Sequence, residues 1–410
     1  MTDPVENFIR SAEDLTASIE NMNEDDRARV LQKLYETTTK VESPWDTFPA
    51  TIAALKVLND LRLLEKWQAK GNVAMSEIEL AELAGGSCDA ALLREQLIVF
   101  LARREELTGT DRLLRLLASN NLVDMMPDGK FKPDKFCVRL ADTDFGTTAH
   151  FYFDYMVPTL SHMPKYLAKT HYLNPRNGRK TMFDSAFGYE GGLFKYLQEN
   201  PEKGQAFNIL QKTSTSSHTR WTEIFPPHIL LDSDPTLPLL VDVGGSIGQD
   251  IQAFYEKHPE TASRLYLEDI PSVIADENSS VVKGINKLTY NFFKPQPIKH
   301  ARAYYMHHIL HDWPDQTVLK ILEMQKSAMK PGYSKLLIHD HIIDDDKPPH
   351  PHAAGYDILM MVLGSAQERT EKQWRSLMDA AGLRIVKIWR TASAVQGVIE
   401  VELPVKGSHL

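Results

Sequence analysis

The segment from Leu239 to Gly248 reads LLVDVGGSIG, and it decides the fold. Its first half is an apolar strand, its second half is a glycine-rich turn, and a helical pattern follows over 249–258. Glycine is needed where the backbone must bend sharply and let a ligand approach without a Cβ in the way. The segment therefore predicts a strand, a turn and a helix that hold a cofactor on the turn.

The spacing of the glycines narrows the choice of cofactor. A nicotinamide dinucleotide fingerprint has glycines at its first, third and sixth positions, but counting from Gly244 the third and sixth are Ser246 and Gln249. S-adenosylmethionine (SAM) has no phosphate to anchor, and its charged amino-acid end suits a loop preceded by an acid such as Asp242. Asp269 follows about 20 residues later, where a carboxylate can accept from two ribose hydroxyls. The pattern favours SAM, although glycines alone are equally typical of a plain turn.

Residues 236–410 alternate short apolar runs with helical patterns. We expect strands at 237–243, 264–267, 303–306 and 335–338, and helices at 249–258 and 315–329. This alternation predicts an α/β fold with a mostly parallel sheet covered by helices on both faces. A last helix at 371–381 and two β-rich runs at 383–389 and 395–403 predict a hairpin at the sheet edge.

Residues 1–145 have the pattern of a small helical domain. Helices are expected at 51–67 and at 112–120. Another helix should begin after a cap at Ser76, with Glu79 in the capping-box position. A hairpin is expected within 122–140, around the turn Pro127-Asp128-Gly129. This is the order of a winged helix, and a DNA-binding regulator is one alternative. Because the stretch DRLLRLLASNNL is rich in leucine, we interpret the region instead as a dimerisation domain.

Residues 146–235 contain helical patterns rich in aromatic residues and methionine, at 150–163 and 181–196. Such a composition is typical of plain core. Its position before a cofactor domain also suits the wall of a substrate pocket. We expect a helical region that links the two domains and lines the pocket.

Length, net charge and composition argue against several other classes of protein. A chain of 410 residues exceeds what one core usually supports, and a net charge of −9 opposes binding to nucleic acid phosphates. No apolar run approaches the roughly 18 residues of a membrane span, and the acidic start is not a secretory signal. Two cysteines, Cys88 and Cys137, are typical of a reduced, cytoplasmic protein. We expect no membrane contact, no disulfide and no metal site.

A histidine-rich segment, YMHHILHDWPD at 305–315, begins on an expected strand and passes its carboxyl end. Open α/β sheets carry their chemistry at that end. His311 can serve there as a general base. An isolated histidine is more often structural, so this assignment depends on its neighbours.

Four motifs follow one another along the second half of the chain, and their order is characteristic: VDVGG at 241–245, DIPSVI at 269–274, HDW at 311–313 and ERT at 368–370. Over 236–403 the chain therefore resembles the catalytic domain of the plant and fungal small-molecule O-methyltransferases. The front half resembles that family's winged-helix dimerisation region, and SPWD at 43–46 is similar to its fungal branch. The resemblance implies a SAM-dependent homodimer that releases S-adenosylhomocysteine.

The resemblance also implies roles for particular residues. The histidine that matches His311 takes the proton from the substrate hydroxyl, and acids at the positions of Asp340 and Glu368 hold its ring in place. Carboxylates beside an imidazole fix its tautomer and favour its protonated state. The cofactor is assigned to Asp242, Gly244, Gly245, Gly248, Asp269, Asn291 and Phe292. A flat apolar slot for the acceptor is assigned to Phe183, Phe187, Met360 and Met361.

This sequence departs from the family pattern at three places. Asn291 stands where many relatives have an aspartate, and His307 replaces a basic side chain near the adenine. The stretch REQLIVFLARREELTGTD at 94–111 has the character of an insertion into a leucine-rich helix. The first two departures predict altered contacts with the adenine, and the third concerns only the N-terminal domain.

The expected activity is transfer of a methyl group to the hydroxyl of a small phenolic or enolic metabolite, whose identity apolar side chains do not specify. Some members of the fold bind SAM but catalyse pericyclic or dehydration reactions instead. Retention of His311, Asp340 and Glu368 favours transfer.

Overall fold

The computed structural model of the chain describes residues 4–18, 22–23, 26–27, 29–31, 33–34, 57–84, 112–120, 122–178, 180–216, 218–279, 281–391 and 395–405. The expected features at 43–46, 51–56 and 94–111, and Cys88, lie outside these residues.

An eight-stranded sheet forms the core of the C-terminal half, in the order β5-β4-β3-β6-β7-β10-β9, with β8 paired to β7. Its strands are β3 (Leu240–Val243), β4 (Leu265–Asp269), β5 (Asn286–Thr289), β6 (Ala303–His307), β7 (Lys335–Ile343), β8 (Arg369–Thr370), β9 (Arg384–Trp389) and β10 (Gln396–Glu402). All strand pairs are parallel except those that β10 makes with β7 and β9. The α/β class and the hairpin at the edge are confirmed. The short strands β5 and β8 were not expected.

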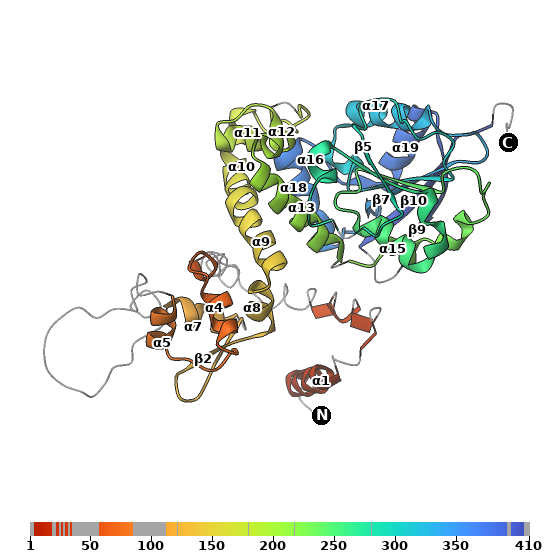
Figure 1. The fold of residues 1–410 in the computed structure, drawn as a ribbon. Coiled ribbons are helices and arrows are strands. Elements are labelled where there is room, and N and C mark those ends of the chain that lie inside the picture. Colours follow the sequence, from red (N-terminus) through yellow and green to blue (C-terminus); the bar gives the residue numbers. More distant parts are fainter. Residues whose placement is uncertain are drawn as a thin grey trace, which may run out of the picture.

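Helices cover both faces of this sheet (Figure 1). On one face Leu322 and Trp374, from α17 (Asp315–Lys326) and α19 (Glu371–Ala381), pack on the strands. On the other face Trp221 and Phe254, from α14 (Trp221–Ile224) and α15 (Gln249–Lys257), pack on the strands. The remaining short helices here are η3 (Pro227–Leu230), η4 (Pro259–Arg264), α16 (Pro271–Ile274) and η5 (Leu310–Asp312).

A second group of helices packs beside the carboxyl ends of the strands and shares one apolar core. Its members are α9 (Thr143–Phe151), the π-helix η2 (Tyr152–Met156), α10 (Val157–Lys169), α11 (Met182–Phe187), α12 (Gly192–Glu199), α13 (Pro201–Ser216) and α18 (Pro351–Gly364). The single helix expected at 181–196 is wrong. It divides because Gly188 and Gly191 have φ of 62° and 131°, which a continuing right-handed helix does not allow.

The N-terminal elements form their own small core, set apart from the sheet in Figure 1, and α8 to α10 lead from one to the other. They are α4 (Leu63–Ala69), α5 (Glu77–Leu83), α7 (Arg112–Ser119), β1 (Val123–Met125), β2 (Phe131–Pro133) and α8 (Lys135–Leu140). The first helix, α1 (Pro4–Ser18), contributes no residue to this core. The capping box of Ser76 and Glu79 is confirmed, as is a hairpin at 127–129. The helix expected over 51–67 is interrupted, because Arg62 adopts φ 51° just before α4.

The sheet topology fixes where a ligand can bind. From β3 the chain proceeds to β4 and β5 on one side, and β6 and β7 follow on the other. Ligands of open α/β sheets bind at the carboxyl ends of strands beside such a reversal. Both the glycine turn after β3 and the histidine segment after β6 lie there. In the described part of the chain, no helix is long and apolar enough to cross a membrane.

Candidate active site

The turn after β3 accepts only glycine at two positions. Gly244 and Gly248 adopt φ of 72° and 94°, in the left-handed region. A Cβ added to Gly244 would lie 2.6 Å from Cδ1 of Ile309, and one added to Gly248 would lie 2.0 Å from Cγ2 of Val281. The turn therefore needs its glycines both for its backbone shape and for its close packing.

Two carboxylates flank this turn, a buried one from Asp242 and a partly exposed one from Asp269. Asp269, at the end of β4, accepts hydrogen bonds from the backbone N–H of Ser246 at 2.9 Å and of Ile270 at 2.7 Å, one on each oxygen. Each oxygen keeps a further lone pair, which suits a ribose diol. Burial raises the pKa of Asp269 to about 6. Asp242 lies directly beneath the turn, since a Cβ on Gly245 would come within 2.5 Å of its Oδ2.

Asn291 and Phe292 complete the cofactor side. The Asn291 side-chain oxygen accepts from the backbone N–H of Phe293 at 2.9 Å, so Asn291 shapes its own loop. The Phe292 ring lies next to the turn, 3.8 Å from where a Cβ on Gly244 would stand. An open glycine turn, a carboxylate with free lone pairs and an aromatic face are the groups that a ribose-bearing sulfonium cofactor needs. The expected SAM residues thus fit that cofactor.

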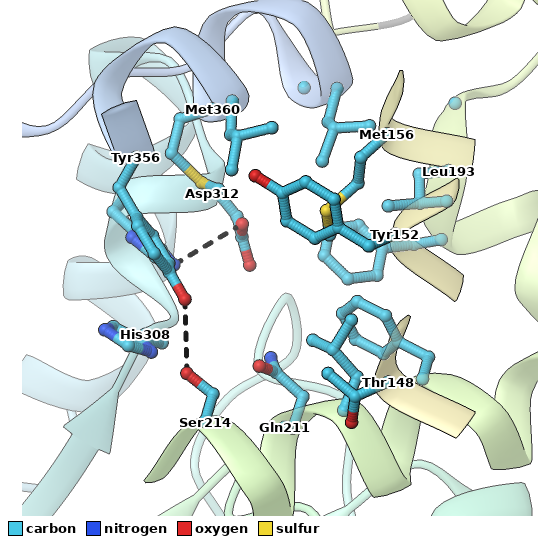
Figure 2. Close-up of a pocket in the computed structure, with 18 of the residues that line it drawn as sticks. Thr148, Tyr152, Met156, Leu193, Gln211, Ser214, His308, Asp312, Tyr356 and Met360 are labelled. Atoms are coloured by element: carbon cyan, nitrogen blue, oxygen red, sulfur yellow. Dashed lines mark hydrogen bonds and ion pairs between the residues drawn. The ribbon is translucent and has the colours of Figure 1, made fainter. Parts of the chain in front are cut away.

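A cavity of about 290 Å³ is walled by α9, η2, α12, α13, α18 and the loop after β6, and none of the assigned cofactor residues lines it. Figure 2 shows Thr148, Tyr152 and Met156 facing Tyr356, His308 and Asp312 across it. Its apolar side chains include Phe145, Met156, Leu193, Phe194, Phe207, Trp313, Leu359, Met360 and Leu363. Polar side chains such as Thr148 and Gln211 line it too, besides those at the histidine end, where Tyr356 and Ser214 form a 3.2 Å hydrogen bond. The cavity suits a flat, mostly apolar molecule that carries some polar groups.

His311 lies in η5 at this histidine end and is only 3% exposed. Its Nδ1–H donates to Oε1 of Glu368 at 2.8 Å, and its Nε2 is 3.5 Å from Oδ1 of Asp312. Burial by itself lowers the pKa of His311, but the Glu368 and Asp312 carboxylates outweigh it and raise the pKa to about 10. The ring is therefore a positively charged imidazolium, with both nitrogens protonated, at neutral pH.

Asp340 and Glu368 do not share the role that was expected of them. Both oxygens of Asp340 are buried and have no hydrogen-bond partner among the described residues, and burial raises the pKa of Asp340 to about 7. Instead His341 donates its Nδ1–H to Glu368 Oε1 at 3.2 Å. Successive side chains of a strand point to opposite faces, so β7 turns His341 toward Glu368 and Asp340 away from it. Asp340 thus acts on His311 only through its charge.

Arg369 joins the ERT motif to the HDW motif. Its side chain is fully buried, and its guanidinium donates to the backbone oxygens of Leu310 at 3.0 Å and Trp313 at 2.7 Å. It also pairs with Asp315 at 2.8 Å. One side chain therefore fixes the backbone on both sides of His311, next to the glutamate that holds the ring.

The four expected slot residues separate into two groups. Met360 lines the cavity. Phe183 is fully buried in the helical core, and Phe187 and Met361 pack against the same core, so none of these three belongs to the cavity wall. Because neighbours on a helix point about 100° apart, α18 cannot direct Met360 and Met361 to the same place.

Sequence reasoning missed several polar residues at the cavity's histidine end. His308 stacks on His311 with ring centroids 4.6 Å apart and planes at 9°, and burial lowers its pKa well below the usual value. His352 and Tyr356 extend the wall from α18. Their spacing of four residues, just before the two methionines, is the signal that would have indicated one helical face.

The comparisons with known proteins agree with this geometry. The O-methyltransferase domain family matches residues 169–384. The O-methyltransferase mfmE of Annulohypoxylon moriforme is 43% identical over 389 residues, which cover 93% of this chain and 92% of that protein.

Among solved structures, LepI in complex with SAM superposes with a TM-score of 0.84 at 25% identity, over 98% of this chain and 100% of that one. A structure described as a pericyclic reaction enzyme superposes with a TM-score of 0.83 at 26% identity, covering 97% and 100%. The matching family domain and the 43% identity to mfmE show that the chain belongs to the O-methyltransferase family, and the solved structures place it among SAM-dependent enzymes.

Proposed function

We propose that the enzyme methylates a hydroxyl of a small aromatic or enolic metabolite and that His311 is its general base. The observation that carries this proposal is one imidazole at the end of a largely apolar cavity, with its far nitrogen held by a buried carboxylate. When bound, SAM supplies the methyl group. The residues of this chain align the acceptor oxygen and take its proton.

The pKa of His311 suits a phenolic acceptor. A phenol has a pKa of about 10, and the Glu368 carboxylate brings the pKa of His311 to about 10 as well. Proton transfer from the acceptor hydroxyl to the unprotonated ring is then close to balanced, and the fraction of unprotonated ring rises as the pH approaches that pKa. Placing the oxygen in line for displacement can contribute on the order of 7–11 kcal/mol, and a placed base typically about 10²–10⁴-fold.

The cofactor assignment is part of the same proposal. Asp269 would accept from the ribose hydroxyls, and Gly244, Gly245 and Gly248 would let the cofactor lie against the turn. Phe292 would pack on the adenine, and Asp242 would balance the positive end. The acidic partners of His311 are then Glu368, through a hydrogen bond, and Asp312 and Asp340, through their charges.

A pericyclic or dehydration activity is the second candidate. It is favoured by one observation, the 26% identity and the TM-score of 0.83 to a structure described as a pericyclic reaction enzyme. SAM carrying a labelled methyl group separates the two. A panel of phenolic polyketides, flavonoids and hydroxylated alkaloids should yield a labelled product if the enzyme is a methyltransferase. If an acceptor is consumed while the label stays on the cofactor, the pericyclic function holds.

We also propose the domain organisation expected from the sequence: a dimerisation domain at 1–145, a pocket-lining region at 146–235 and a SAM-binding domain at 236–410. The separate apolar core of the N-terminal elements supports the first of these. Light scattering of the full chain should give twice the mass of one chain, and a monomer would contradict the dimer. The chain's two cysteines support a cytoplasmic location.

A further inference from the structure

Three imidazoles meet beside the cavity, and two of them, His308 and His311, line its wall. One ring nitrogen from each of His308, His311 and His341 lies within 4.8 Å of the other two. All three residues are buried. They come from the loop after β6, from η5 and from β7, so it is the tertiary fold that brings them together.

Glu368 orients two of these rings at once. Its Oε1 accepts from Nδ1 of His311 at 2.8 Å and from Nδ1 of His341 at 3.2 Å. A carboxylate that holds one ring nitrogen in this way turns the opposite nitrogen toward a metal, as in many histidine metal sites. Nε2 of His341 is buried and has no hydrogen-bond partner among the described residues. A buried polar atom of this kind is costly unless something binds it.

We propose that His308, His311 and His341 bind a divalent transition metal ion of the zinc class. Zinc takes three imidazoles at about 2.0–2.1 Å and leaves a fourth position for water or substrate. The rings of His311 and His341 lie at only 9° and 19° to that of His308, so they must rotate out of this stack to direct their nitrogens at one ion. The open position faces the cavity, because His308 and His311 line it. Imidazole nitrogen selects Zn²⁺, Co²⁺ or Ni²⁺ over Mg²⁺ and Ca²⁺, which take oxygen ligands.

The site has a consequence for the proposed methyl transfer. Nε2 of His311 cannot coordinate a metal and accept the acceptor's proton at the same time. Bound zinc therefore removes the base and occupies the histidine end of the cavity. Zinc should inhibit methyl transfer, and a chelator should restore it. Metal binding itself does not depend on the proposed function, so the two can fail separately.

A second cluster provides an internal comparison. Asp250, His307 and His339 also place three possible ligand atoms within 4.8 Å of one another. Nδ1 of His307 donates to Asp250 Oδ2 at 2.7 Å, and Nδ1 of His339 pairs with the Tyr305 hydroxyl at 2.8 Å. As in His341, Nε2 of both rings is buried with no hydrogen-bond partner among the described residues. None of these residues lines the cavity. A variant at His339 therefore tests whether an ion prefers the cavity cluster.

The direct test is metal titration of the full-length chain after treatment with a chelator. Zn²⁺ is followed by calorimetry, and Co²⁺ by its visible absorption. One ion should bind per chain with the absorption of a four- or five-coordinate cobalt site, and Mg²⁺ should not bind. Absence of zinc binding to the unaltered chain would overturn the proposal.

Variants locate the site. His341→Asn should weaken zinc binding, and Glu368→Gln should weaken it by about 10–100-fold, as loss of a group that orients a ligand does. His339→Asn and His228→Asn, the latter an exposed histidine elsewhere, should bind zinc as the unaltered chain does. If His339→Asn or His228→Asn lost zinc affinity while His341→Asn kept it, the ion would bind elsewhere.

Folding is controlled separately. Each variant should bind S-adenosylhomocysteine and unfold at a temperature close to that of the unaltered chain. If His341→Asn does not fold, His308→Asn removes another of the three imidazoles, from a different segment of the chain. A folded variant of either kind that keeps full zinc affinity contradicts the three-histidine site.

Discussion

His311 donates its Nδ1–H to Oε1 of Glu368 across 2.8 Å, although the two residues lie 57 positions apart. Burial raises the pKa of Glu368, but the charge and the hydrogen bond of His311 outweigh it and lower that pKa below its usual value. In turn the glutamate raises the pKa of His311 to about 10. The pair is thus an ion pair at neutral pH, and its charge state should govern how the rate depends on pH.

The first prediction concerns that pH dependence. A raised pKa means that His311 is protonated below about 10 in the acceptor-free enzyme and becomes a free base only as the pH rises toward that value. Because kcat/KM reports the free enzyme, it should rise with pH through the alkaline range. Steady-state rates in overlapping buffers check this. A plateau that begins near the pKa of an ordinary histidine would contradict the raised value.

Glu368→Gln should move that rise to lower pH. The substitution removes the carboxylate charge that raises the pKa of His311 and leaves an amide oxygen of similar shape. The maximal rate should also fall, by about 10²-fold, because the protonated ring loses its partner. Glu277→Gln, at an exposed acid, is the matched control and should change neither quantity. An unshifted pH profile in Glu368→Gln would show that Glu368 does not set the charge of His311.

Asp269→Asn should weaken cofactor binding without changing the affinity for the acceptor. A hydrogen bond to a charged group contributes roughly 1.5–3 kcal/mol, which corresponds to roughly ten- to hundred-fold in Kd. The amide still accepts one of the two backbone hydrogen bonds that position the turn. Calorimetry with S-adenosylhomocysteine measures the loss, with Glu277→Gln again as control. Unchanged cofactor affinity would remove Asp269 from the ribose site.

Gly248→Ala should disrupt the cofactor turn. The new Cβ would lie 2.0 Å from Cγ2 of Val281 at a φ of 94°, and the left-handed backbone alone costs about 1–2 kcal/mol for a residue with a Cβ. Both the free energy of unfolding and SAM affinity should fall. Gly355→Ala is the matched control, since it lies exposed in α18 with nothing within 4 Å of an added Cβ. It should stabilise the helix by roughly 0.5–1 kcal/mol.

Met360 and Met361 give a paired test of the acceptor cavity. Met360→Ala removes a cavity-lining side chain, so KM for the acceptor should rise by roughly ten-fold or more. Met361→Ala removes a side chain from the helical core and should lower stability more than it changes KM. Equal changes of KM in the two variants would contradict this placement. Steady-state kinetics together with thermal unfolding separate the two effects.

The sequence was informative where one local pattern determines structure. The strand, turn and helix around Gly244 follow from apolar residues leading into glycines, and α19 occupies the expected 371–381. The division of the helix at 181–196 was missed, because Gly188 and Gly191 interrupt an apolar pattern that otherwise continues.

The site was less predictable, because its partners meet only through the tertiary fold. That His341, and not Asp340, contacts Glu368 depends on which face of β7 each side chain takes. The stacking of His308 on His311 depends on a left-handed turn at His308, with φ of 52°. Neither contact follows from the motifs, because a motif gives the order of residues along the chain and not the direction in which each side chain points.

The most direct test of the account is transfer of a labelled methyl group from SAM by His311→Ala, with binding of S-adenosylhomocysteine measured on the same preparation. We predict that labelled product from a phenolic acceptor falls by about 10²–10⁴-fold while cofactor affinity stays nearly the same. A variant that keeps close to the normal rate of transfer would contradict the assignment of His311 as the base.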